Sequence, residues 1–230
     1  MGSHTNLSID ITPQVLLKAY ACGIFPMAES ASDPTLYWIE PEERGVLPLD
    51  RVRVPKRLIR TIRQEKFQIE VDNDFAGIIA GCAASRPGRR TTWINRRITE
   101  LYRELFEMGH CHTVEAWRDG QLVGGLYGVH LGGAFFGESM FSIERDASKV
   151  ALVYLAARLI YGRFKLLDTQ FVTEHLEQFG AIEISRGQFH RYLSEALQAH
   201  SGFHELPRGV SASEVLQLVS QTSKTGCSTP

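Results

Sequence analysis

Polar side chains suited to chemistry stand among apolar residues at two places in this chain. Glu138 lies inside the aromatic run of residues 135–142, and Asp168 and Gln170 follow Leu167. Burying an uncompensated carboxylate costs several kcal/mol, so each acid must be paired, hydrogen-bonded or functional. Two acids and an amide of this kind are candidates for binding a cation and orienting a group that carries a proton. A core carboxylate satisfied by hydrogen bonds is the alternative for either acid.

Strand periodicity predicts which of these side chains share a face. Residues two apart in a strand point the same way, so Asp168 and Gln170 should lie on one face of their strand. By the same rule Phe136, Glu138 and Met140 should share a face of another strand.

Composition is that of an ordinary globular protein of 230 residues. No apolar run approaches the roughly 20 residues that cross a bilayer, and the N-terminus lacks the basic and apolar regions of a signal peptide. We therefore expect a soluble, cytoplasmic protein with no membrane partner.

The cysteines form no CxxC pair, so a zinc ribbon or a redox motif is not indicated. The motif His110-Cys111-His112 has no second ligand cluster near it in sequence, and a polar start to a strand explains it. We expect no metal site.

Charge is unevenly distributed along the chain. Residues 51–97 hold twelve Lys or Arg and four Asp or Glu, a local charge of +8 in a chain of net charge −1. A helix predicted from Pro55 to Lys66 carries Lys56, Arg60 and Arg63 on one face, with Arg57 flanking it. This pattern indicates a footprint for a phosphate backbone, and a solvated surface is the alternative.

The order of predicted elements indicates an α+β fold. A small irregular N-terminal domain (residues 1–54) contains a helix that begins with Thr12 and Pro13. A larger domain (residues 55–230) contains a three-stranded meander from Thr113 to Ser142, a central helix from about Ser148 to Tyr161 and a buried strand, Phe164–Val172, with helices after it. This order is typical of acyltransferases of the N-acetyltransferase (GNAT) type, with a mixed sheet flanked by helices. In that fold the two strands flank the centre of the sheet, and the polar side chains would converge.

The acyl donor is not expected to be acyl-coenzyme A. A GNAT acetyltransferase binds the coenzyme diphosphate with a glycine-rich loop before the central helix. The corresponding residues 142–147 contain no glycine and carry two acids, Glu144 and Asp146.

Seven blocks, in order, resemble the bacterial leucyl/phenylalanyl-tRNA–protein transferase family, a GNAT branch. The blocks are Ala19-Tyr20 with residues 23–27, Tyr37-Trp38 with Pro41 and Arg44, Thr92-Trp93-Ile94, residues 109–117, residues 122–128, residues 136–142 with Ala147-Ser148-Lys149, and Leu167-Asp168 with Gln170. The resemblance implies transfer of Leu or Phe from aminoacyl-tRNA to the α-amino group of proteins that begin with Arg or Lys, which marks them for N-degron degradation. The ester is already activated, so no cofactor is implied.

The resemblance also implies roles for individual residues. Asp168 and Gln170 would orient the attacking amine, and Glu138 would hold the basic N-terminal residue or its ammonium; which acid contacts the basic side chain stays open. Substrate would be bound by Leu126, Phe135, Met140 and Ser139, with Trp38 and Trp93 stacking on the terminal adenine or walling the pocket. The helix with Lys56, Arg57, Arg60 and Arg63 would bind the tRNA acceptor arm.

Two positions depart from the family pattern, and two other functions compete. Ile143 replaces an Arg and Thr169 replaces a Cys, which leaves the side-chain preference of the donor pocket open. A small-molecule GNAT acetyltransferase conflicts with the loop at 142–147. A non-catalytic RNA-binding protein explains the basic sector but not Glu138, Asp168 and Gln170.

Overall fold

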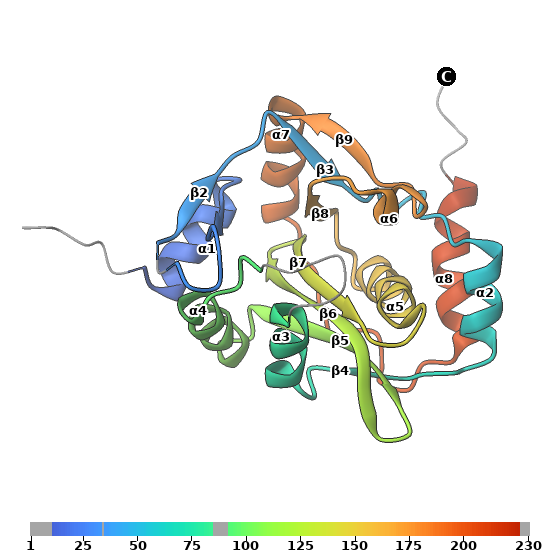
Figure 1. Cartoon of the computed structure of the whole chain (residues 1–230). Helices are drawn as coiled ribbons and strands as arrows, with labels where there is room; N and C mark the ends of the chain where they lie inside the picture. Colours follow the sequence, from blue (N-terminus) through green and yellow to red (C-terminus); the bar gives the residue numbers. More distant parts are fainter. Residues whose placement is uncertain (1–10, 34, 85–91, 226–230) are drawn as a thin grey trace, which may run out of the picture.

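A single mixed sheet organises the molecule. The computed structural model describes residues 11–33, 35–84 and 92–225, and in this part of the chain seven strands pair in the order β4-β5-β6-β7-β8-β3-β9 (Figure 1). All neighbours are antiparallel except β7 and β8, which run parallel. The strands are β3 (Glu43–Val46), β4 (Gln68–Val71), β5 (Cys111–Arg118), β6 (Gln121–Leu131), β7 (Ala134–Ser142), β8 (Leu166–Gln170) and β9 (Ile182–Ser185).

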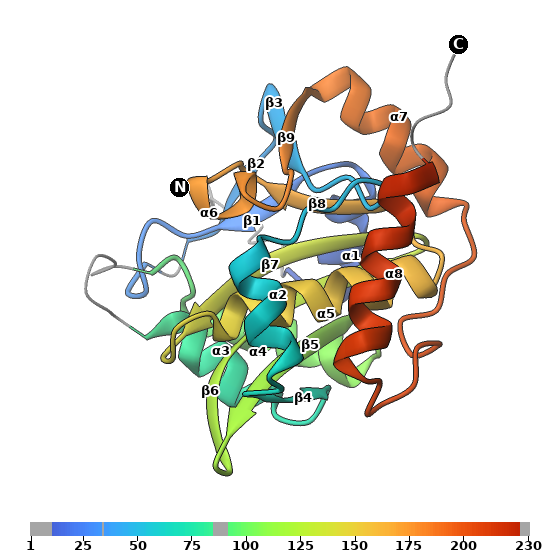
Figure 2. The same ribbon diagram turned by 90° about the vertical axis from the view of Figure 1, so that its right-hand side faces the viewer.

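Helices cover both faces of this sheet, and the sheet separates two hydrophobic cores. On one face α2 (Lys56–Arg63), α5 (Ala147–Tyr161) and α8 (Ala212–Thr225) contact one another (Figure 2). The helices whose buried residues belong to the second core are α1 (Pro13–Ala21), α3 (Phe75–Ala83), α4 (Arg96–Glu107) and α7 (Arg186–Leu197). The predicted α+β fold, a mixed sheet flanked by helices, is confirmed. Among the described residues, no helix has both the length and the apolar character needed to span a membrane.

Local sequence accounts for where these elements begin and turn. Thr12 accepts a hydrogen bond from the amide of Val15, and Pro13 occupies the first turn of α1, as predicted. Asp119 and Gly120 both have positive φ and form the tight turn between β5 and β6. The central helix α5 is apolar almost all round, because it is buried between the sheet and two other helices.

The N-terminal segment contributes a strand to the main sheet. β1 (Phe25–Met27) and β2 (Tyr37–Ile39) form a separate two-stranded sheet among the described residues, but β3 lies between β8 and β9. The expected domain boundary at residue 54 stays a prediction. The sequence pattern did not reveal the short elements β4, α3 and β9. A helix was predicted after the strand with Asp168, and α6 (Glu174–Glu177) is that helix, shorter than expected.

A bulge in β7 changes which side chains share a face. Tyr127 pairs with Ser139 and Gly128 with Gly137, so Glu138 is the extra residue. Phe136 belongs to the core that contains Tyr20, whereas Met140 packs against the core on the other face. The expectation that Phe136, Glu138 and Met140 share a face is therefore wrong, because strand alternation shifts by one residue at the bulge.

Candidate active site

A cavity lies where β7 and β8 separate. The two strands pair only as far as Phe136 and Asp168, and beyond this point residues of both strands line a cavity of about 380 Å³. The apolar lining consists of Leu126, Met140, Phe141, Leu152, Leu155, Leu167 and Leu176. The polar lining includes Glu138, Ser139, Thr169, Gln170, Thr173 and His175. The structure thus brings the predicted Glu138 and Gln170 to one apolar cavity.

Asp168 lies behind this cavity in a fully buried ion pair with Arg44. Arg44 Nε donates to Oδ1 over 2.8 Å and Nη2 donates to Oδ2 over 2.6 Å, and Nη1 donates to the Gly23 carbonyl. The guanidinium lies between the rings of Phe25 and Phe189, 4.6 and 4.5 Å from their centroids. This bidentate, stacked geometry is one that arginine forms and lysine cannot. The sequence had indicated that Asp168 needs a partner, but not that Arg44 is that partner.

Gln170 is held against Asp168 by its own backbone. Its amide donates to Asp168 Oδ1 over 2.9 Å, and its side-chain Nε2 lies 3.4 Å from Oδ2. The backbone of Gln170 is left-handed, with φ of 57°, which is rare for a residue other than glycine and is typical of functional sites. Gly45 lies opposite, and a Cβ there would come within 2.6 Å of the Phe171 backbone, so this turn requires glycine in β3.

Glu138 is hydrogen-bonded to two tyrosines from different helices. Tyr20 of α1 donates to Oε1 over 2.7 Å and Tyr102 of α4 donates to Oε2 over 2.9 Å, and the two hydroxyls also contact each other. Burial raises the pKa of Glu138 to about 7, although the tyrosine hydrogen bonds oppose that rise. Neither tyrosine was predicted as a site residue; Tyr20 fits an ordinary apolar helix stripe, and only the buried acid signalled that donors were needed.

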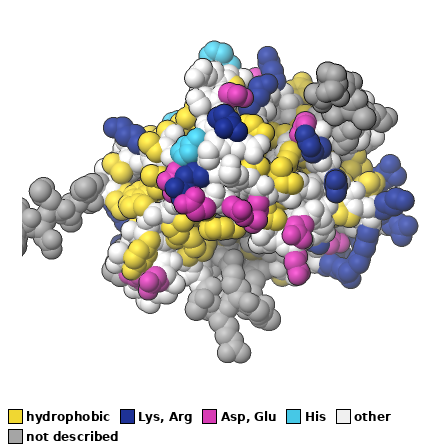
Figure 3. Space-filling view, turned by 90° about the horizontal axis from the view of Figure 1, so that it is seen from above, with side chains coloured by type: hydrophobic (Ala, Val, Ile, Leu, Met, Phe, Trp, Pro, Cys, Tyr) yellow, Lys and Arg dark blue, Asp and Glu magenta, His cyan; other side chains and the backbone are white. Residues whose placement is uncertain are grey.

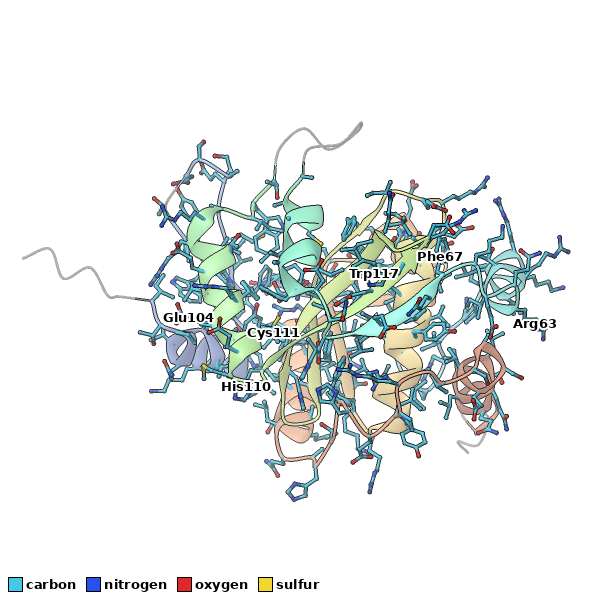
Figure 4. The ribbon with its side chains drawn as sticks, turned by 90° about the horizontal axis from the view of Figure 1, so that it is seen from below. Arg63, Phe67, Glu104, His110, Cys111 and Trp117 are labelled. Carbon is cyan, nitrogen blue, oxygen red and sulfur yellow. The ribbon has the colours of Figure 1, made fainter. Side chains whose placement is uncertain are left out.

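The predicted basic helix is α2, and its cations are exposed. Lys56, Arg57, Arg60 and Arg63 form no ion pair with any other described residue. Lys and Arg side chains gather on the side of the molecule where α2 lies (Figure 3). Arg63 lies at the outer edge of the molecule on this side (Figure 4). A second cavity of about 490 Å³ is lined by Arg57, Arg145 and Lys149 and shares Ser142, Ser148 and His175 with the first. The acids Glu144 and Asp146 also line this second cavity, so residues of both charges connect α2 with the cavity that contains Glu138 and Gln170.

Comparison with known proteins decides the family. A family model described as leucyl/phenylalanyl-tRNA protein transferase matches residues 46–194, and the model of its N-terminal domain matches residues 9–42. This chain belongs to the leucyl/phenylalanyl-tRNA protein transferase family. The leucyl/phenylalanyl-tRNA–protein transferases of Nitrobacter winogradskyi and Rhodopseudomonas palustris are 59% and 58% identical to it, over 96% and 95% of this chain and 99% of their own lengths. The relative of the same name from Caulobacter vibrioides is 56% identical over 90% of this chain and 96% of its own. The chain is an aminoacyltransferase of this family.

The first cavity, between β7 and β8, includes only some of the predicted substrate-binding residues. Leu126, Ser139 and Met140 line it. Phe135 does not, because it is fully buried and stacks on Phe203 in the core. Trp38 lies exposed on β2, and Trp93 is partly buried and packs against the second core; neither is among the lining residues that the structure describes. The predicted cations Arg86, Arg89 and Arg90 lie outside the described residues.

The two departures from the family pattern both face these cavities. Thr169 lines the first cavity, and its Oγ1 is buried with no hydrogen-bond partner among the described residues. Ile143 lines the second cavity beside Arg145 and is 66% exposed. The arginine that the resemblance leads one to expect at position 143 would add a cation to that cavity.

One group of described residues outside the cavities has the donors for a metal ion. Ligand atoms of Asp72, His112 and His204 all lie within 4.8 Å of one another. Hydrogen bonds already account for their arrangement: Asp72 Oδ1 accepts from the Thr113 amide, and Oδ2 lies 2.8 Å from His112 Nδ1 and 3.2 Å from His204 Nε2. The partners of His112 in this group are thus residues distant in sequence, and not its neighbours His110 and Cys111 (Figure 4). The expectation of no metal stays a prediction.

Proposed function

We propose that this transferase moves Leu or Phe from aminoacyl-tRNA to the α-amino group of proteins that begin with Arg or Lys. The observation that carries the proposal is the apolar cavity that contains Glu138 and Gln170 and shares part of its lining with a second cavity, which reaches Arg57 of the cationic helix α2. An apolar slot suits the acyl side chain, a carboxylate suits a cationic acceptor, and exposed cations suit tRNA phosphates.

The donor binds with its side chain in the aliphatic part of the cavity. Leu126 and Met140 form the walls of this slot, and the flexible thioether of Met140 accommodates both a branched and an aromatic side chain. Trp38 and Trp93 stack on the terminal adenine or wall the entrance, a role that rests on the family resemblance. The phosphates of the acceptor arm are contacted by the four cations of α2, Lys56, Arg57, Arg60 and Arg63. These contacts recognise the shape and charge of the arm rather than its base sequence.

The reaction is aminolysis of the ester that joins the amino acid to the terminal ribose. The neutral α-amine attacks the ester carbonyl carbon, and the ribose oxygen leaves. Gln170 accepts a hydrogen bond from the amine, and Asp168 fixes Gln170 through the two contacts between them. Because Arg44 holds both carboxylate oxygens of Asp168, this pair orients the amine and does not remove its proton. The ester is activated in the donor, so the chemistry needs no cofactor.

The acceptor brings one or two positive charges to this cavity. Glu138 lines the cavity and holds the basic N-terminal residue or its ammonium, whereas the charge of Asp168, behind the cavity, is paired with Arg44. Modification of such N-termini with Leu or Phe directs proteins to N-degron degradation in the cytoplasm.

Incubation with labelled Leu-tRNA and a protein that begins with Arg tests the proposal. We expect label to appear on that protein and not on a version that begins with Ala. Transfer of acetyl groups from acetyl-coenzyme A without label transfer would instead support a small-molecule acetyltransferase. Tight tRNA binding without either reaction would support a non-catalytic RNA-binding protein.

A further inference from the structure

The hydroxyls of Tyr20 and Tyr102 and the carboxylate of Glu138 form a closed triangle of three polar groups. Each tyrosine hydroxyl lies within hydrogen-bond distance of one carboxylate oxygen, at 2.7 and 2.9 Å, and the hydroxyls contact each other. Both tyrosines are fully buried, whereas Glu138 is only partly buried and lines the cavity. Of these three groups, only the Glu138 carboxylate can therefore contact a substrate in the cavity.

The number of hydrogens available to this triangle depends on the charge of Glu138. When the carboxylate is ionised, only the two tyrosine hydroxyls carry a hydrogen. The three groups make three oxygen–oxygen contacts, so one of these contacts then has no hydrogen. A proton on Glu138 supplies the third hydrogen, and each group then donates once and accepts once around the ring. All three contacts can therefore be hydrogen bonds only when Glu138 carries a proton. The two tyrosines still stabilise the ionised carboxylate, because both can donate to it.

The groups that face Glu138 favour a proton that can be bound and released near neutral pH. The charge of Asp168 of β8 raises the pKa of Glu138, and Arg44 of β3 pairs with Asp168 and opposes that effect. Tyr127 of β6 and Cys111 of β5 also interact with groups of the triangle, and His175 lines the same cavity as Glu138. Burial raises the pKa of Glu138 to about 7 and that of both tyrosines well above their usual range, so the tyrosines stay protonated and only the carboxylate titrates.

Asp168 lacks the properties that Glu138 has. It is fully buried, and its two oxygens accept from Arg44 Nε, Arg44 Nη2 and the Gln170 amide, with Gln170 Nε2 at 3.4 Å. The oxygens of Asp168 therefore serve the guanidinium and the Gln170 amide, and Asp168 does not line the cavity.

We propose that Glu138, held by the positioning residues Tyr20 and Tyr102, is the group that accepts the proton of the acceptor's α-ammonium. This inference rests on the proposed aminoacyl transfer. One N–H proton of the ammonium passes to a Glu138 oxygen, and the amine lone pair forms a bond to the ester carbonyl carbon. The bond from that carbon to the ribose oxygen breaks, and a second N–H proton goes to the departing oxygen, which leaves as a hydroxyl. Glu138 then releases its proton to water.

The pH dependence of kcat at saturating Arg-peptide and Leu-tRNA tests this assignment, because kcat reports groups in the bound complex. In the unmodified enzyme we expect an acid limb with an apparent pKa near 7, below which kcat falls tenfold per pH unit. Tyr102→Phe removes a donor to the ionised carboxylate, so the acid limb should move up by about one pH unit. The variant should lose about tenfold in kcat at pH 6.5 and recover most of it at pH 9.

Three further variants make the outcome decisive. Glu138→Gln should remove the acid limb and lower kcat about 100-fold or more at every pH. Tyr20→Phe should behave as Tyr102→Phe does. The matched control is Tyr161→Phe, whose side chain is exposed and does not line the cavity, and its profile should not change.

A constant loss of kcat across the pH range in both tyrosine variants would contradict the proposal, because a purely structural role has no reason to move the acid limb. So would a Glu138→Gln enzyme that raises only the KM for the acceptor, which is the result expected if Glu138 merely holds the basic side chain. A carboxyl carbon NMR titration of Glu-labelled protein gives a readout without catalysis: one glutamate should titrate near pH 7 and be missing in Glu138→Gln. If no label is transferred at any pH, the proposed function itself is wrong; transfer with an unmoved acid limb contradicts only this inference.

Discussion

Arg44 is the side chain most tightly fixed in the candidate site, although it lies far from its partner Asp168 in the sequence. It donates to Asp168 through two nitrogens and to Gly23 through the third, between two aromatic rings. Asp168 in turn fixes the backbone amide of Gln170. The orientation of the Gln170 side chain in the cavity therefore depends on Arg44, although Arg44 does not line the cavity.

Substitution of Arg44 should separate stability from activity. Arg44→Met leaves a buried carboxylate unpaired and should destabilise the fold by about 3–5 kcal/mol, measured by urea unfolding. The double variant Arg44→Met plus Asp168→Asn should regain part of that free energy, because no charge is left unpaired, while Leu transfer stays lost. Arg158→Met is the matched control: Arg158 is also buried but donates to carbonyl oxygens of residues 203–207, so this variant should lose stability and keep kcat while folded. A double variant with normal transfer would contradict the orienting role of the pair.

The width of the aliphatic slot should set the choice between Leu and Phe. Met140→Ala shortens a side chain that lines the cavity and should favour the larger amino acid. We expect the ratio of kcat/KM for Phe-tRNA to that for Leu-tRNA to rise about tenfold, the usual scale for a change of this size in an apolar pocket. Competition between the two labelled tRNAs measures the ratio directly. Met108→Ala is the control, because Met108 is exposed and does not line the cavity; an equal shift in both variants would rule out the slot.

At the scale of elements, α2 combines a buried apolar side with an exposed cationic one. Leu58 and Ile62 anchor it in the core with α5 and α8, which leaves its four cations free for a partner. The partly shared lining of the two cavities places this helix next to the candidate site rather than on an unrelated surface.

Neutralising this face should weaken tRNA binding in a salt-dependent way. Lys56→Ala plus Arg60→Ala should raise the Kd for tRNA and lower the slope of log K against log salt by about 1 for each removed contact. Filter binding over a range of salt concentrations measures both quantities. Arg103→Ala plus Arg191→Ala removes the same charge from α4 and α7 and should leave the slope unchanged. Equal slopes in the two double variants would show that α2 does not bind the tRNA.

Sequence patterns predicted the long elements well and the short ones poorly. The meander, the central helix and the strand with Asp168 are rich in apolar residues, because each is buried along most of its length. β3 and β9 have four residues each, too few for a period, and their place beside β8 depends on distant pairing. The bulge at Glu138 depends on pairing as well, and a Cβ at Gly128 opposite would come within 2.3 Å of the Phe136 carbonyl. Partners such as Arg44, Tyr20 and Tyr102 are set by tertiary packing, so sequence indicated only that the acids required them.

At the scale of the whole molecule, the candidate site lies between two separate cores. Tyr20 and Tyr102 reach Glu138 from the core of α1, α3, α4 and α7, whereas Leu126 and Met140 belong with the core of α2, α5 and α8. Each face of the sheet thus supplies a different part of the site: hydroxyl donors from one and an aliphatic slot from the other. The site therefore forms only when both cores are assembled, and its strained groups draw on the stability of the whole chain.

The charge of Glu138 should consequently lower the stability of the whole protein at neutral pH. The pKa of Glu138 is about 7 in the folded protein and 4.5 for an unperturbed glutamate, so between these pH values the folded state binds a proton that the unfolded state does not. The free energy of unfolding must then fall as pH rises through this window and level off above about pH 7, by at most about 3 kcal/mol from this group. Glu138→Gln removes the titration. Urea unfolding at pH 5 and pH 8 should show nearly equal stabilities of the two proteins at pH 5 and a more stable variant at pH 8, in spite of its lost activity. Glu195→Gln, at an exposed position on α7, serves as the control and should follow the unmodified protein at both pH values. A Glu138→Gln protein that is no more stable than the unmodified one at pH 8 would mean that Glu138 carries its charge in the folded state without cost, and the site would then have no reason to take a proton near neutral pH.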